Sequence, residues 1–206
     1  MLGFQVSMQD NDSYAFREYP PLTEYQRIHQ ALLPDMSGNS RPNVLRCNAC
    51  AELLGKWDES LSGLIVKKRK YDISVTFDGV TLVSKRFQSA YESAALSGLA
   101  FKQLPDDADF LAVRPSRSVE FDAERRKTRF INRCATCCRF ESVVGATPVY
   151  LKAGTIIGLK EFVRTDLEFG SNDEKHPLLL CGRTAAEVIK NAKFKGIHLN
   201  EQVDSE

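Results

Sequence analysis

Two short stretches decide the fold of this chain: VLRCNAC at residues 44–50 and RCATC at residues 133–137. Each contains two cysteines separated by two residues, a spacing that places both sulfurs on one side of a tight turn. Two such turns supply the four thiolates of a tetrahedral zinc site. The sequence therefore predicts one structural zinc ion bound by Cys47, Cys50, Cys134 and Cys137.

The cysteine pattern leaves other interpretations open. A redox-active CxxC motif, or thiols that are merely buried, would use the same residues. Cys138 directly follows Cys137, so either is a candidate fourth ligand, and the regular spacing favours Cys137. Zinc knuckles often have glycine after the second cysteine because a positive φ turns backbone N–H groups toward the sulfurs, but Ala51 and Cys138 occupy those positions. Cys181 is expected to be a spare, buried thiol.

The composition is that of an ordinary globular chain. Of 206 residues, 43% are hydrophobic and 27% are charged, which argues against wholesale disorder. The net charge of +1 lacks the basic excess of a protein that coats duplex nucleic acid. No apolar run is long enough to span a bilayer, and the N-terminus has no secretory-signal pattern. We therefore expect a cytoplasmic protein.

Apolar periodicity predicts the same order of elements twice: a strand, a helix, a glycine and a second strand. We interpret the fold as α+β, with either an internal duplication or a chance likeness between two common units. The αβ half-units would span residues 44–105 and 131–204 of a single domain, 1–206, joined by the zinc-ribbon-like four-cysteine site. The elements are 80–84, 86–96, Gly98 and 99–104 in the first half, and 178–181, 184–192, Gly196 and 197–203 in the second.

No further group of residues has the spacing of a known catalytic site, so the chain is not expected to be an enzyme. Asp106, Asp107 and Asp109 lack the downstream pattern of a calcium loop and are expected in a solvated turn. Residues 154–158 contain two glycines but lack the lysine of a phosphate loop. We expect them at a strand edge.

Two basic runs, residues 67–70 and 125–129, suggest an alternative function. Basic and aromatic side chains beside zinc knuckles can hold phosphates and stack bases. The chain would then be a zinc-ribbon nucleic-acid-binding module. The other interpretation is a pair of solvated hairpins balanced by nearby acids such as Glu120, Asp122 and Glu124, and it agrees better with the small net charge.

Both CxxC stretches, Trp57 behind the first, and two glycine-containing segments further along occur in the order of a known family. Over roughly residues 43–200, the chain resembles the double-CxxCG motif immunity proteins, which include myxobacterial proteins that protect cells against swarm-inhibition toxins. Both glycines of the CxxCG motif are absent here. The glycine-containing segments are KAGT at residues 152–155 and FKGI at residues 194–197.

The resemblance implies a cytoplasmic antidote that binds a cognate antibacterial toxin and blocks it stoichiometrically, without catalysis. Such a protein needs a sizeable surface with a few aromatic or arginine anchors and complementary charge. The motifs do not identify the toxin-binding residues. The polar stretches 10–40 and 104–126 are candidates.

Overall fold

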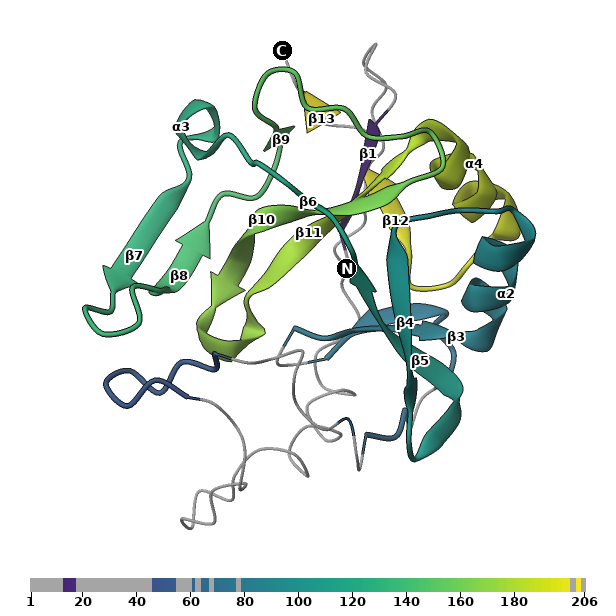
Figure 1. The fold of residues 1–206 in the computed structure, drawn as a ribbon, viewed down its shortest axis with the longest axis horizontal. Coiled ribbons are helices and arrows are strands. Elements are labelled where there is room, and N and C mark those ends of the chain that lie inside the picture. Colours follow the sequence, from purple (N-terminus) through teal and green to yellow (C-terminus); the bar gives the residue numbers. More distant parts are fainter. Residues whose placement is uncertain are drawn as a thin grey trace.

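The computed structural model describes one N-terminal strand and most of the chain from residue 46 onward (Figure 1). Trp57, Lys67, Lys68 and most of the candidate stretch 10–40 lie outside the described residues. Among the described residues, no helix has the length and apolarity needed to cross a membrane. The described ranges are residues 13–17, 46–54, 61, 64–66, 69–76, 79–200 and 203–204.

Strands dominate the described residues and form two main sheets. The larger sheet has seven strands in the order β12-β1-β11-β10-β8-β7, with β6 also paired to β10; the smaller has four in the order β2-β3-β5-β4. Strands β13 and β9 form a short parallel pair. The strands are β1 (Ser13–Arg17), β2 (Ile73–Val75), β3 (Thr81–Ser84), β4 (Leu99–Leu104), β5 (Asp107–Pro115), β6 (Ser118–Val119), β7 (Arg129–Arg133), β8 (Phe140–Val144), β9 (Val149–Tyr150), β10 (Phe162–Ser171), β11 (His176–Gly182), β12 (His198–Asn200) and β13 (Val203–Asp204).

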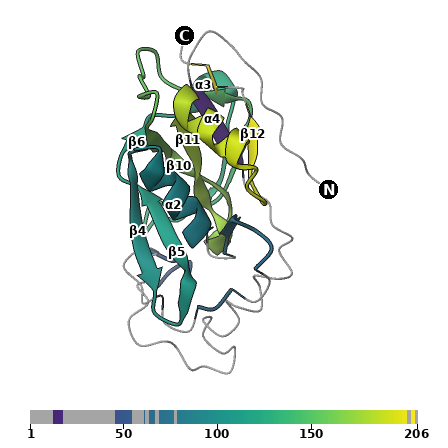
Figure 2. The ribbon, with the colours of Figure 1, turned by 90° about the vertical axis from the view of Figure 1, so that its right-hand side faces the viewer.

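Few helices accompany these sheets, so the prediction of an α+β fold is confirmed at that level. Helices α2 and α4 lie on the same side of strands β10 and β11 (Figure 2). Each begins directly after a strand, α2 after β3 and α4 after β11. The helices are α2 (Lys85–Ser93), α3 (Ala123–Arg126) and α4 (Arg183–Ala192), with a short 3-10 turn η1 (Asn172–Glu174).

The main core lies between helices α2 and α4 and both sheets. In β11, Leu179 and Cys181 belong to this core, whereas Leu180 belongs to a second core. Both faces of the strand are covered, which agrees with the unbroken apolar run at residues 178–181. Phe87 of α2 and Phe194 after α4 meet with their ring centroids 5.3 Å apart. The two strand–helix units therefore share one core, and Cys181 is a buried thiol as expected.

Helices α2 and α4 are each followed by a glycine that contacts a strand of the other strand–helix unit's sheet. Gly98 has φ +92, and a Cβ there would lie 2.1 Å from the carbonyl oxygen of Phe162 in β10. Gly196 has φ +84, and a Cβ there would lie 2.4 Å from the carbonyl oxygen of Ile73 in β2. Phe162 and Ile73 also donate their backbone N–H groups to the carbonyl preceding the respective glycine, at 2.8 and 3.4 Å. The glycine after the helix of each unit thus makes the same kind of contact with a strand of the other unit.

Replacing Gly98 with alanine is expected to lower the free energy of unfolding by more than about 2 kcal/mol, since a backbone clash adds to left-handed strain. Gly154→Ala is the matched control: φ there is +80, but an added Cβ meets nothing within 4 Å. Only the conformational cost, about 1 kcal/mol, is expected for it. Denaturant unfolding measures both losses. Equal losses would show that the close contact with Phe162 does not stabilise the fold.

Two local expectations are wrong. Residues 154–158 form no strand edge but an irregular loop between β9 and β10, in which Ile156 is 80% exposed. Asp107 is not in a solvated turn; it begins β5, is 3% exposed and accepts a hydrogen bond from the Val66 N–H group at 2.9 Å. Arg69 forms an ion pair with it at 3.2 Å. The buried charge is tolerated because it is paired and hydrogen-bonded.

Candidate metal centre

The two CxxC stretches fold into the same turn. In each, the N–H group of the first cysteine donates to the carbonyl five residues later, at 2.9 Å in both turns. The N–H group of the residue after the second cysteine donates back to the carbonyl of the first cysteine, at 2.8 and 2.9 Å. Each donor and each acceptor in the second turn lies 87 residues after its equivalent in the first turn, just as Cys134 lies 87 residues after Cys47. The similarity of the two motifs thus extends to their backbone hydrogen bonds.

The residue after the second cysteine is left-handed in both turns. Ala51 and Cys138 each have φ +60. These are the positions at which the CxxCG pattern has glycine, so the same backbone forms here without it, at a cost of roughly 1 kcal/mol per residue. Cys138 is exposed at this turn position, whereas Cys137 lies among the clustered cysteines. The cluster therefore contains the cysteine that regular spacing favours.

Changing Cys138 to glycine is expected to raise the free energy of unfolding by about 0.5–1 kcal/mol, because relief of left-handed strain exceeds the added entropy of the unfolded chain. Ala51→Gly should do the same in the other turn. Metal content should stay unchanged in both variants. Loss of bound metal from the Cys138→Gly protein alone would show that Cys138, and not Cys137, is a ligand.

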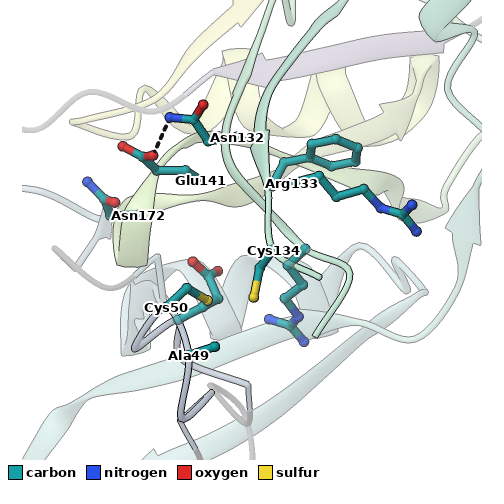
Figure 3. A pocket seen from close by; sticks show the side chains of 10 residues that line it. Ala49, Cys50, Asn132, Arg133, Cys134, Glu141 and Asn172 are labelled. Atoms are coloured by element: carbon teal, nitrogen blue, oxygen red, sulfur yellow. Dashed lines mark hydrogen bonds between the residues drawn. The ribbon is translucent and has the colours of Figure 1, made fainter. Parts of the chain in front are cut away.

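The four predicted ligands lie together. Figure 3 shows two of them, Cys50 and Cys134, on two loops that approach each other. The four sulfurs all lie within 4.8 Å of one another. The Cys47 and Cys134 sulfurs are 3.8 Å apart, and those of Cys50 and Cys137 are 3.6 Å apart. A tetrahedral zinc with Zn–S bonds of about 2.3 Å requires sulfur–sulfur distances of about 3.8 Å. The arrangement is therefore compatible with a four-coordinate metal site.

Backbone N–H groups in each turn favour the thiolate form of the first cysteine. The N–H groups of the second cysteine and of the residue before it lower the pKa of Cys134 to about 6, and the same groups lower the pKa of Cys47. At Cys50 the N–H group of Glu52 acts in the same sense, but desolvation and the neighbouring sulfurs outweigh it and raise the pKa to about 12. Full ionisation of all four sulfurs therefore calls for a compensating cation.

A buried ion pair supports the first turn. The Nζ of Lys175 lies 2.9 Å from Oε2 of Glu52, and the two side chains are 4% and 6% exposed. Lys175 also donates to the carbonyl oxygens of Glu141 in β8, at 3.2 Å, and Asn172 in η1, at 2.9 Å. One ammonium group thus connects the first turn with the strand that follows the second. The sequence motifs indicated neither Glu52 nor Lys175, because the two are separated by 123 residues.

Arginine side chains make further connections around the turns. Arg139, after the second turn, donates to the carbonyl oxygens of Leu53 and Leu54, after the first, at 2.9 and 3.1 Å. Arg46, before the first turn, forms an ion pair with Asp173 at 2.9 Å. Arg139 occupies the position in the second turn that Glu52 occupies in the first. The two turns therefore keep the same backbone but use different side chains to contact the rest of the protein.

A pocket of ≈ 360 Å³ lies beside Cys50 and Cys134, lined by both turns, β7, β8 and η1 (Figure 3). Its wall includes Asn132, which donates to Oε2 of Glu141 at 2.7 Å. Asn172 lines another side. The pocket exposes one edge of the cysteine cluster to solvent, so the centre lies near the protein surface and not in the main core.

The described members of the two basic runs have different surroundings. Arg69 of the first run pairs with the carboxylates of Asp107 and Asp109. In the second run, the Arg125 guanidinium lies 4.4 Å from the centre of the Tyr150 ring, whereas Arg129 is exposed on β7. Arg69 is therefore balanced by acids, whereas the second run presents Arg129 to solvent.

Comparison with protein-family models and with curated proteins finds no match to this chain. The resemblance to the immunity family thus rests on the sequence motifs and their order alone.

Proposed function

We propose that this chain is an immunity protein that binds a cognate antibacterial toxin in the cytoplasm and neutralises it by stoichiometric occlusion, without catalysing a reaction. The observation that carries the proposal is the left-handed backbone at Ala51 and Cys138. The chain departs from the CxxCG pattern at these two residues, yet each has the conformation that glycine would supply. The departures therefore preserve the turn geometry.

The proposed cofactor is one structural zinc bound by Cys47, Cys50, Cys134 and Cys137 in a zinc-ribbon-like site. The sulfur–sulfur distances of 3.6 and 3.8 Å support a tetrahedral ion. Four sulfur ligands close the coordination shell and leave no position for water or substrate. Zinc would supply free energy of folding by holding the two turns together, and it would contribute no chemistry to a reaction.

We also propose that the domain, residues 1–206, arose by duplication of an αβ half-unit, with the halves near residues 44–105 and 131–204. The matching turns, the paired strand–helix junctions and the two reciprocal glycine contacts support this. The cysteine centre then joins one turn from each half. A metal at this place fixes the pose of the halves and gives the toxin a rigid surface, which reduces the entropic cost of binding.

Titration of a purified toxin with this protein tests the proposal. The candidate toxin is the protein encoded immediately upstream, and its activity is measured against increasing amounts of the antidote. Inhibition that saturates near one equivalent supports occlusion, and co-expression should restore growth. Progressive inactivation by sub-stoichiometric amounts would instead demonstrate an enzyme. No inhibition together with no rescue of growth would reject the immunity function for this pair.

A further inference from the structure

The β7–β8 hairpin projects from the body of the protein (Figure 1), and it exposes apolar side chains. Strand β7 is the last strand of the larger sheet, and no described strand pairs with its outer edge. All five β7 residues are exposed. Phe130, Ile131 and Val144 are 40%, 39% and 38% exposed. An exposed edge with apolar side chains is a template for pairing with another strand.

The charge of this edge is positive. Arg129 and Arg133 lie two positions to either side of Ile131, and neither forms an ion pair with a described residue. Lys127 is exposed just before the strand. The one acid in the sequence of the hairpin, residues 129–144, is Glu141, which accepts a hydrogen bond from the side-chain amide of Asn132 at 2.7 Å. Within the described part of the chain, the edge therefore combines backbone groups without a strand partner, apolar side chains, and arginines without an ion pair, of which Arg133 donates to the Cys138 carbonyl at 3.4 Å.

This charge pattern disfavours a second copy of the same chain as the partner. An antiparallel β7–β7 pair centred on Ile131 would place Arg129 of each copy opposite Arg133 of the other. Like charges directly opposite one another destabilise a strand pair. Basic residues on an edge strand thus prevent self-association while remaining attractive to an acidic segment.

We propose that the outer edge of β7 is the toxin-binding surface, and that it binds an extended acidic segment of the toxin as an added strand. This inference rests on the proposed immunity function and places its interface just beyond the candidate stretch 104–126. Asn132 has φ +51, which interrupts the alternation of faces between Ile131 and Arg133, but each residue of β7 still lies opposite one residue of an added antiparallel strand. The segment should therefore contain an acid, an apolar residue and a second acid at alternate positions, which meet Arg129, Ile131 and Arg133.

The same observations favour a protein strand over nucleic acid. A row of backbone N–H and C=O groups that pairs with no described strand matches the backbone of a strand and not the bases of an oligonucleotide. Ile131 and Val144 offer no stacking surface for bases, and the ring of Phe130, although 40% exposed, packs against Phe140 with the centroids 4.9 Å apart. The Arg125 guanidinium in the same run already lies on the Tyr150 ring. The chain's net charge of +1 also gives little general attraction for phosphates.

A charge-swap experiment on the full-length, zinc-loaded protein tests the inference without the toxin. The probe is a short threonine-rich peptide with a central valine and a glutamate two positions to either side; a second probe has lysines in place of glutamates. Binding is followed by backbone amide chemical shifts. The variants are Arg129→Glu/Arg133→Glu and the control Lys102→Glu, at an exposed site on β4, which is the edge strand of the smaller sheet.

The glutamate peptide is expected to bind saturably and to shift the β7 amides. Its affinity should fall at least tenfold in the double variant and stay unchanged in the control. The lysine peptide should bind the double variant better than the wild type. Equal binding of both peptides to the wild type, or no binding of either, would overturn the proposal. So would tighter binding of a single-stranded oligonucleotide that is lost in the double variant, which would indicate a nucleic-acid surface.

The toxin titration separates this inference from the immunity function. If the wild type neutralises the toxin and the double variant does so equally well, the hairpin is not the interface, although the function stands. If the wild type itself fails to neutralise the toxin, the immunity function fails whatever the peptides show. Loss of neutralisation in the double variant alone, mainly through a faster off-rate, supports both proposals.

Discussion

Replacing Cys134 with serine should abolish binding of the proposed zinc and remove most of the free energy of unfolding. Structural zinc contributes about 10 kcal/mol or more in small zinc domains, and a whole domain is typically stable by only about 5–15 kcal/mol. Loss of one sulfur leaves the two turns without their common ion. The measurement combines metal analysis of protein purified without chelator with thermal unfolding. Cys47→Ser should have an equal effect, because the two residues are equivalent in their turns.

Cys138→Ser is the matched control for this experiment. Cys138 is also a cysteine of the second turn, but it is exposed and lies outside the sulfur cluster. Its substitution should change the free energy of unfolding by less than about 0.5 kcal/mol. A chelator should lower the unfolding temperature of the wild type and of Cys138→Ser alike, and have little further effect on Cys134→Ser. Well under one zinc per wild-type chain, or the same stability in all three proteins, would contradict a structural metal.

Local signals in the sequence were sufficient to predict several helices and strands. The strand predicted over residues 99–104 is β4, Leu99–Leu104, and the helix predicted over 184–192 is α4, Arg183–Ala192. The residues that begin and end such elements also act locally. Ser84 caps α2 by accepting a hydrogen bond from the Phe87 N–H group at 3.2 Å, and Gly98, just before β4, supplies a positive φ. Each CxxC turn was predictable for the same reason, whereas the meeting of the two turns was predicted from the four ligands that a tetrahedral zinc requires.

The pairing of strands that are distant in the sequence could not be predicted from such local signals. The order β12-β1-β11-β10-β8-β7 places the N-terminal strand between two strands from the end of the chain, and no periodicity encodes such neighbours. Asp107 was expected in solvent because the carboxylates nearby in sequence suggested a turn, yet Val66 and Arg69 surround it in space. The loop at residues 154–158 resembled a strand because it is rich in β-branched residues, although Gly154 has φ +80.

Replacing Lys175 with methionine is the other change with a large expected effect, a loss of about 3–5 kcal/mol in the free energy of unfolding. Methionine fills the space but leaves the Glu52 carboxylate, 6% exposed, without its cation. The second carboxylate oxygen, Oε1, already has no hydrogen-bond partner. The carbonyl oxygens of Glu141 and Asn172 also lose a donor. Urea unfolding measures the loss, and Lys102→Met, at an exposed site on β4, should have little effect.

The double variant Glu52→Met/Lys175→Met distinguishes a charge effect from a packing effect. Removing both charges of a buried pair often costs less than removing one, because no unpaired charge remains in the interior. The double variant should therefore be more stable than Lys175→Met, and its residual loss should reflect the two carbonyl hydrogen bonds. Lys175 and the proposed zinc both hold the first turn against the second. Their losses should be non-additive in a cycle with Cys134→Ser. Strict additivity would mean that the ion pair supports η1 and β8 independently of the cysteine centre.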